Sequence, residues 1–336
     1  MVPAPRVLLL LAANLALAPT AQAQAQQDAC WLRTVPVSVL DEHVRPVVGL
    51  SVHDFAPSVS GQPAEVASVE PVQGPRRVIV MLDASAGMNH VDAQADLARA
   101  LAADALRAST KAFRAGLVVF DSEVRASYPP AENPKRASAA LRDVHPAKVG
   151  ENQKNEHAAL WDALQAALTL LNPPEFGDAI WVITNGEDAS SQTTPGEIAA
   201  LALARGVRVS ILLFNPATSF PALPVISSGA IFDIPAHTGG LVVRVEAAQG
   251  TFRNREVSYR LTPSQFRELD AAVDVLYAAT QYAIRVQITL PEELTKPAEW
   301  KLSIAAPKWL KVPWRVSYPA LLNAHACAAP PAKSPP

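Results

Sequence analysis

The sequence has no surplus of either charge. Its 29 Lys and Arg residues face 31 Asp and Glu residues, which leaves a net charge of −2 over 336 residues. A chain without a basic excess lacks the electrostatic footprint of a nucleic-acid-binding protein. Apolar residues make up 49% and charged residues 18%, and these shares exclude a disordered polypeptide. We therefore predict a folded globular protein, with roughly two domains at about 150 residues per domain.

A transmembrane-length apolar run is also missing near the start of the chain. The run at residues 7–17 follows Arg6 and is interrupted by Asn14. It is far shorter than the roughly 20 apolar residues that span a bilayer. Small residues follow it at positions 21–25, which is typical of a secretory signal. We expect residues 1–25 to be a cleaved signal peptide. The mature protein is then periplasmic or extracellular, with no membrane span.

Cysteine is scarce, with only Cys30 and Cys327. In an exported chain two cysteines most simply pair, so we expect a disulfide between the two ends of the chain. Two free thiols are the alternative, because Cys327 borders a Pro- and Ala-rich tail at 328–336 whose composition predicts disorder. Glycine is also sparse, at 14, whereas the 30 prolines predict many extended or rigidly turned segments.

The pattern of apolar residues divides the chain into three folded parts. Short apolar runs between prolines predict an N-terminal β segment over 26–75. Beyond it, continuous apolar runs at 78–82, 116–120, 179–184 and 207–214 alternate with helical periodicity at 92–109, around 160–171 and at 195–204. This alternation predicts a doubly wound, mostly parallel α/β domain over 76–245. A helix at 263–280 followed by short strands predicts a C-terminal α+β extension over 246–327.

Polar residues follow two of the predicted parallel strands, where ligand sites of such sheets lie. Five segments around them resemble, in order, the von Willebrand factor type A (VWA) domain, and more closely the VWFA-related secreted proteins of bacteria. The segments are LDASAGM (82–88), GLVVFDSEV (116–124), AALWDAL (158–164), WVITNGEDASS (181–191) and HTGG (237–240). The resemblance extends over about 35–318 and implies a VWA/Rossmann-like fold.

The resemblance also implies a divalent-ion site, which in this family is built from two carboxylates, three hydroxyls and water. Asp83 and Ser85 match the first carboxylate and the first hydroxyl. Gly87 and Ala158 replace the other two hydroxyl residues, and Asn185 replaces the second Asp. Because two hydroxyls and one negative charge are missing, we predict a degenerate site with no resident cofactor.

Asp83 and Ser85 are then expected to fix the loop by bonding nearby backbone N–H groups. The alternative is a Mg²⁺ or Mn²⁺ site at Asp83, Ser85 and Asn185, in which Glu187, Asp188 or Asp121 compensates for the missing charge.

Protein–protein recognition at the rim of strand-end loops is the function that the resemblance implies. We expect a non-catalytic, metal-independent module that binds another protein at this rim or through the loops at 128–134 and 151–156. One alternative is a Mg²⁺- or Mn²⁺-dependent adhesion module. Another is a serine hydrolase with Ser85 as nucleophile and His237 or His157 as base. The hydrolase hypothesis is weakened by Asp83, because its negative charge would oppose the oxyanion that develops during hydrolysis.

Overall fold

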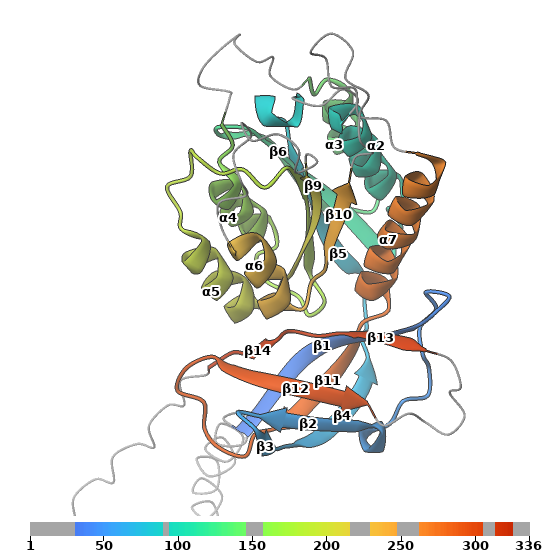
Figure 1. Cartoon of the computed structure of the whole chain (residues 1–336), viewed down its shortest axis with the longest axis vertical. Coiled ribbons are helices and arrows are strands. Elements are labelled where there is room, and N and C mark those ends of the chain that lie inside the picture. The colour runs from blue at the N-terminus through green and yellow to red at the C-terminus, as the bar shows by residue number, and fades with distance from the viewer. Residues whose placement is uncertain are drawn as a thin grey trace, which may run out of the picture.

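The computed structural model describes residues 31–89, 94–145, 157–215, 229–246, 262–304 and 313–324. These residues form an α/β unit and a β-sandwich, stacked end to end (Figure 1). The predicted signal peptide at 1–25, both Cys30 and Cys327, and the tail at 328–336 lie outside the described residues.

The α/β unit is built on one six-stranded sheet, in the order β10-β9-β8-β5-β6-β7. All neighbouring strands are parallel except β7, which runs antiparallel to β6. This is the doubly wound order in which the connections reverse direction between β5 and β8. The strands are β5 (Arg76–Asp83), β6 (Phe113–Phe120), β7 (Val124–Ala131), β8 (Ala179–Thr184), β9 (Arg208–Asn215) and β10 (Val242–Glu246).

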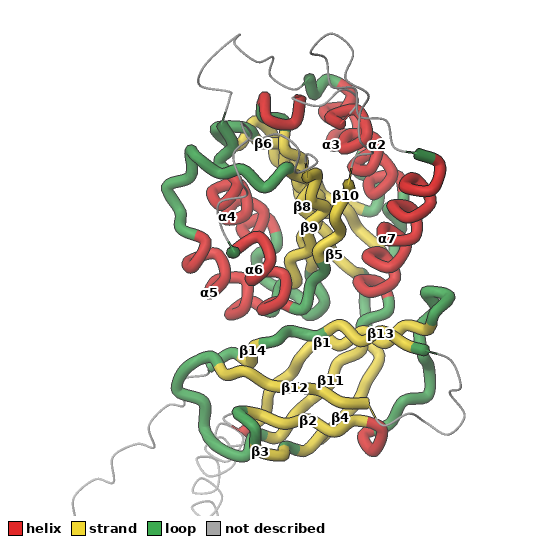
Figure 2. The backbone as a smooth tube through the Cα atoms, viewed as in Figure 1, coloured by secondary structure: helices red, strands yellow, loops and turns green. Residues whose placement is uncertain are grey.

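Helices cover both faces of this sheet (Figure 2). Successive side chains of a strand point to opposite faces, so Val80 packs with α2, α3 and α7, whereas Ile79 and Met81 pack with α4, α5 and α6. The helices are α2 (Gln94–Arg107), α3 (Lys135–Arg142), α4 (Leu160–Leu170), α5 (Pro195–Arg205), α6 (Ala230–Thr238) and α7 (Pro263–Gln281). The predicted fold class, a doubly wound and mostly parallel α/β sheet of VWA/Rossmann type, is confirmed.

Part of the predicted 128–134 loop is a strand. Tyr128, Pro129 and Pro130 belong to β7, which pairs with β6 only. An edge strand tolerates proline because only one side of its backbone must hydrogen-bond. The companion loop at 151–156 lies outside the described residues.

The β-sandwich takes strands from both ends of the chain. One sheet has the order β13-β1-β11-β4 and the other β14-β12-β2-β3. Their shared core includes Val37, Val59, Ile288 and Trp300. The strands are β1 (Leu32–Asp41), β2 (Phe55–Val59), β3 (Gln62–Pro63), β4 (Glu65–Pro71), β11 (Ile284–Thr289), β12 (Ala298–Ile304), β13 (Trp314–Ser317) and β14 (Leu321–Leu322). The segments predicted separately at 26–75 and 246–327 thus contribute to one folded unit, while α7 belongs to the α/β unit.

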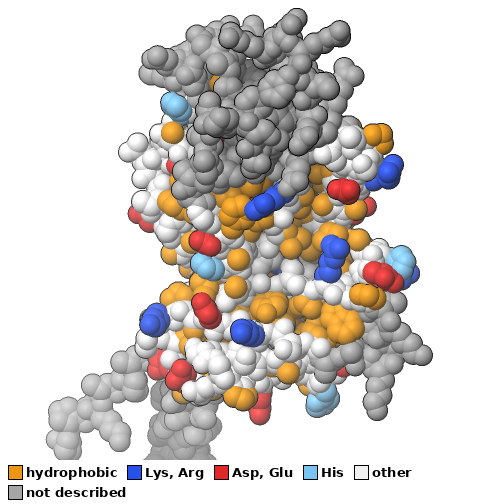
Figure 3. Space-filling view, viewed as in Figure 1, with side chains coloured by type: hydrophobic (Ala, Val, Ile, Leu, Met, Phe, Trp, Pro, Cys, Tyr) orange, Lys and Arg blue, Asp and Glu red, His pale blue; other side chains and the backbone are white. Residues whose placement is uncertain are grey.

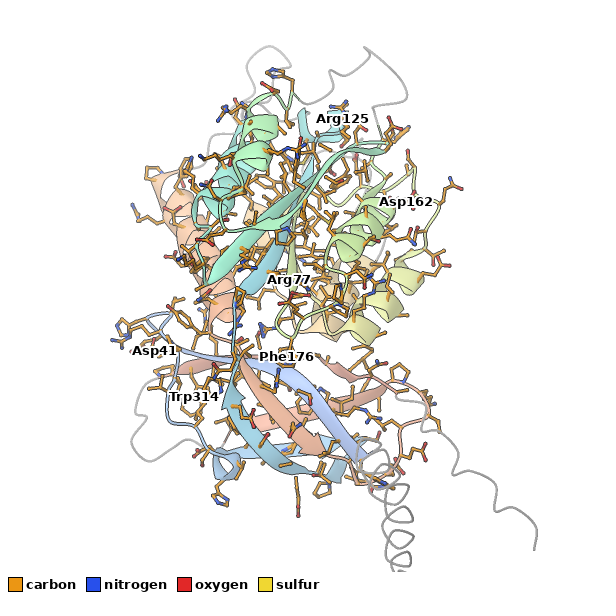
Figure 4. The ribbon with its side chains drawn as sticks, turned by 180° about the vertical axis from the view of Figure 1, so that it is seen from behind. Asp41, Arg77, Arg125, Asp162, Phe176 and Trp314 are labelled. Atoms are coloured by element: carbon orange, nitrogen blue, oxygen red, sulfur yellow. The ribbon has the colours of Figure 1, made fainter. Side chains whose placement is uncertain are left out.

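Two kinds of polar contact join the units. The buried Arg208 of β9 donates to the Ala279 carbonyl at 2.7 Å and to the Ser38 hydroxyl of β1 at 2.8 Å. Arg285 of β11 lies 4.7 Å from the ring centroid of Phe176, which precedes β8. Figure 4 places Phe176 at this junction, below Arg77. The Arg208–Ser38 bond and the Arg285–Phe176 contact each join one unit to the other, whereas the Arg208–Ala279 bond ties β9 to α7 within the α/β unit.

No helix in the described ranges combines the length and apolarity that a bilayer crossing needs.

Candidate functional site

The candidate site lies where β5 and β8 end side by side, at the reversal point of the sheet. Asp83 is the last residue of β5 and Thr184 the last of β8. The Ser85 backbone N–H donates to Asp83 Oδ1 at 2.9 Å, and the Thr184 hydroxyl donates to Oδ2 at 2.7 Å. Thr184 also accepts from the Gly186 N–H at 3.0 Å. One carboxylate therefore connects the loops that follow both strands.

Asp83 is held in an environment that disfavours its charge. Its side chain is buried, and this burial raises the pKa of Asp83 to about 6. The hydrogen-bond donors on Ser85 and Thr184 act in the opposite direction, and the nearby Glu187 carboxylate adds to the rise. The Ser85 hydroxyl is buried beside the carboxylate without a hydrogen bond of good geometry among the described residues.

The space beside Gly87 is filled by two other side chains. A Cβ atom on Gly87 would lie 2.5 Å from Asn185 Nδ2 and 2.6 Å from Glu187 Oε2. Asn185 Oδ1 in turn accepts the Glu187 backbone N–H at 3.0 Å. Asn185 and Glu187 therefore lie where the hydroxyl side chain that the resemblance implies at position 87 would extend.

Ala158 supplies backbone contacts where the resemblance implies a hydroxyl side chain. It is fully buried, and its carbonyl accepts the N–H groups of Ala189 and Ser190 at 3.0 and 3.1 Å. These bonds fix the loop after β8 against the start of α4. The first turn of α4 is close to the same loop.

The cap of α4 comes from far along the sequence. Asp188 Oδ1 accepts the Leu160 N–H at 2.8 Å, and the Ser191 hydroxyl accepts the Trp161 N–H at 3.0 Å. A cap contributed by a loop 28 residues downstream gives no local sequence signal, so Asp188 was proposed only as a metal ligand.

Asp121 is engaged as well. It forms an ion pair with Arg125, which is labelled in Figure 4, and accepts the Glu123 N–H at 3.2 Å. Asp188, Asp121 and Glu187 are the three carboxylates that could compensate for the missing charge. Among the contacts above, only the Glu187 carboxylate neither caps a helix nor forms an ion pair. In the described part of the chain, no three His, Cys, Asp or Glu side chains converge as a metal-binding group. The residues present thus do not match the ligand set of the intact family site.

Ser85 lacks the surroundings of a hydrolase nucleophile. Its side chain is 0% exposed, and no histidine in the described ranges bonds to it. His237 lies in the last turn of α6, just before β10 begins, and therefore at the opposite end of the sheet from Ser85. His157 is exposed ahead of α4. Among the described residues, the Ser85 hydroxyl is thus buried and has no hydrogen bond to a histidine.

Comparisons with known proteins give weak structural likenesses. No family model and no curated protein sequence matches the chain. Among solved structures, BatB of Bacteroides thetaiotaomicron is 19% identical, with a TM-score of 0.42 over 59% of this chain and 98% of its own. An aerotolerance-related membrane protein of Bacteroides fragilis is 17% identical, with a TM-score of 0.41 over the same shares.

The SpRpn10 VWA domain is 13% identical, with a TM-score of 0.36 over 52% of this chain and 89% of its own. The fold assignment therefore rests on this chain's own strand order and helix placement, and these define a VWA/Rossmann-like α/β unit joined to a β-sandwich.

Proposed function

We propose that the chain is a non-catalytic binding module that recognises another protein without a metal ion. The observation that supports this proposal is the use of both Asp83 oxygens inside the protein, by Ser85 N–H and the Thr184 hydroxyl. Together with Gly87 and Ala158, which offer no side-chain oxygen, this arrangement favours a rigid rim over an ion site.

A second candidate function is Mg²⁺- or Mn²⁺-dependent adhesion. Two observations favour it: Glu187 lies beside the Gly87 position, and the Ser85 hydroxyl has no well-formed hydrogen bond among the described residues. If a cation bound here, Asp83, Ser85 and Asn185 would be its side-chain ligands and Glu187 would compensate for the missing charge. The ion would complete its coordination with water or a partner's carboxylate.

Thermal unfolding of the full chain separates the two candidates. A ligand bound only to the folded state raises stability by RT ln(1 + [L]/Kd). We expect the same midpoint in EDTA and in millimolar Mg²⁺ or Mn²⁺. A rise in the presence of the ion that disappears in Glu187→Gln would instead establish the adhesion site. The matched control is Glu197→Gln, whose carboxylate only caps α5 through Thr194.

Recognition of a protein needs its own test. A photo-crosslinking amino acid in place of the exposed Ala189, in the loop after β8, is expected to capture a discrete partner with EDTA present. An equal yield from an unrelated exposed position, such as Val48, would count against recognition at the rim.

We also propose that the chain is exported and that Cys30 and Cys327 pair. Expression with and without residues 1–25, followed by mass measurement of the intact secreted protein under oxidising and reducing conditions, tests both points.

A further inference from the structure

A cavity of about 450 Å³ lies at the junction of the two units. Four elements form its walls: the edge strand β10, the C-terminal half of α7, and the strands β1 and β13 of the sandwich. Its described lining residues from the α/β unit include Leu241, Val242, Val243 and Val275, so the walls are largely apolar. On the face seen in Figure 3, apolar side chains lie where the units meet, with side chains of both charges around them.

Both strands beside the cavity present an open edge among the described residues. β10 pairs with β9 only, and β13 pairs with β1 only. Val242, Val243 and Arg244 all line the cavity, and so do Arg315, Val316 and Ser317. Consecutive side chains point to opposite faces of a sheet, so a cavity on one face would be lined by every second residue. Because three consecutive residues of each strand line this cavity, it lies along the edge of the strand.

The backbone carbonyl groups of β10 point alternately toward β9 and toward the cavity. The Leu241 carbonyl accepts the Ile211 N–H at 2.8 Å and so faces β9. Because carbonyl directions alternate along a strand, the Val242 carbonyl faces away from β9, toward the cavity side. An open strand edge is a template for pairing with another extended chain.

The charged residues among the described lining of the cavity have one sign. Arg244 and Arg315 line it and both are exposed, whereas no Asp or Glu is among its described lining residues. Arg244 lies 5.1 Å from the ring centroid of Phe232, and no ion pair joins either arginine to a carboxylate in the described ranges. Behind the wall, the buried Arg208 donates to Ser38, which is itself a lining residue. A carboxylate-bearing ligand is therefore electrostatically complementary.

We propose that this cavity, called the groove from here on, binds an extended acidic segment of the partner protein. The segment adds as a strand to the edge of β10 and directs its carboxylates to Arg244 and Arg315. The segment would alternate apolar and acidic residues, because period two places one kind on the apolar wall and the other beside the arginines. This inference rests on the proposed protein-binding function and names the surface and the chemistry of the partner.

A binding assay with defined peptides tests the proposal. The probe is a fluorescein-labelled alternating valine–aspartate peptide, and its fluorescence polarisation is measured with the full chain in EDTA. We expect saturable binding, weakened about tenfold or more in Arg244→Gln/Arg315→Gln, which corresponds to at least about 1.4 kcal/mol. The matched control is Arg142→Gln, an exposed arginine on α3 far from the groove, which is expected to bind as the unchanged chain does.

Two further probes distinguish strand addition from other binding. A valine–asparagine peptide lacks the charges, and an N-methylated valine–aspartate peptide lacks the backbone donors. Both are expected to bind at least tenfold more weakly. Equal binding of the N-methylated peptide, or displacement of the N-methylated peptide by decanoate, would overturn the proposal and indicate a small-molecule cavity. Absence of binding of the acidic peptide would also overturn the proposal.

Crosslinking separates failure of this inference from failure of the proposed function. A photo-crosslinker at Val243 is expected to capture the same partner as one at Ala189, and excess acidic peptide should suppress only the Val243 product. Capture from Ala189 alone would leave the binding function intact and exclude the groove. No capture from either position would contradict both.

Discussion

Thr184 donates a 2.7 Å hydrogen bond to Asp83 across the ends of two neighbouring strands. Asp83 is buried, so the bond holds a carboxylate whose charge is costly at neutral pH. The raised pKa of Asp83 therefore lowers the stability of the folded protein as pH rises from the usual carboxyl pKa toward the raised value.

Asp83→Asn is expected to gain stability relative to the unchanged chain as pH rises from 4 to 6. The pKa of Asp83 is raised to about 6 in the folded state, so folding takes up a proton in this range and Asp83 disfavours folding above it. The raised pKa corresponds to a cost of about 3 kcal/mol at pH 7. Urea unfolding of both proteins at several pH values measures the difference.

Asp162→Asn is the control for this series. Burial works against ionisation of Asp162, but hydrogen bonds from Thr193 and Gln192 outweigh it and lower its pKa. Its charge therefore stabilises the fold above the unfolded pKa, and this stabilisation is lost as pH falls through the lowered folded value. A stability difference for Asp83→Asn that is constant with pH, or that falls as pH rises, would contradict the prediction.

Restoring two of the three missing ligands is expected to create ion dependence. In Gly87→Ser/Asn185→Asp a second carboxylate lies near Asp83, so the free energy of unfolding in EDTA should fall by about 1–3 kcal/mol through like-charge repulsion. Millimolar Mg²⁺ should recover part of this loss, as measured by the thermal midpoint. The single variant Gly87→Ser is the control. If it alone gave the same Mg²⁺ response, the added carboxylate would not be the cause.

Gly240→Ala is expected to destabilise the chain by about 2–4 kcal/mol. A Cβ atom at Gly240 would overlap the backbone carbonyl of Val209, which cannot move without disturbing β9. Gly196→Ala is the matched control, because the nearest atom to its new Cβ would be the Thr194 hydroxyl at 4.0 Å. In the first turn of α5 the control should gain up to about 1 kcal/mol. Similar urea midpoints for the two variants would contradict the overlap.

Ser38→Ala is expected to weaken the junction between the units by about 1–3 kcal/mol. The Ser38 hydroxyl donates to the Ala279 carbonyl and accepts from Arg208, so its removal leaves a buried cation with one partner fewer. Ser68→Ala removes a partly buried bond to Gln287 within the sandwich and should cost less. Chemical unfolding followed by tryptophan fluorescence measures both. A smaller loss in Ser38→Ala than in Ser68→Ala would be the contrary result.

The α/β unit could be predicted from sequence because its signals are local. The run at 179–184 is β8 as predicted, and the helix expected at 195–204 is α5, whose Thr194 and Glu197 form a capping box. Continuous apolar runs buried on both faces are distinctive of parallel strands. Helix α6 was missed because it is short and contains Pro235.

The remaining features depend on contacts between distant residues. Alternating apolar runs indicated strands at both ends of the chain but not that β1 would pair with β11, since periodicity carries no information about partners. In the candidate site, the positions of Asp83 and Thr184 follow from the strand ends. The roles of Asp188 as a helix cap and of Glu187 beside Gly87 depend on how one loop folds over another, which no local pattern records.

The origin of the β-sandwich in both ends of the chain also fixes the order in which the protein can be completed. About 240 residues separate the end of β1 from the start of β11, its partner in the sheet. At a translation rate of about 5–20 residues per second, β1 emerges roughly ten to fifty seconds before β11 exists. The α/β unit has all its strands available earlier, so it can form first while β1 waits with an unpaired edge. A nascent chain stalled before β11 should therefore be the aggregation-prone species of this protein, and a chaperone that shields β1 should raise the yield of the complete fold.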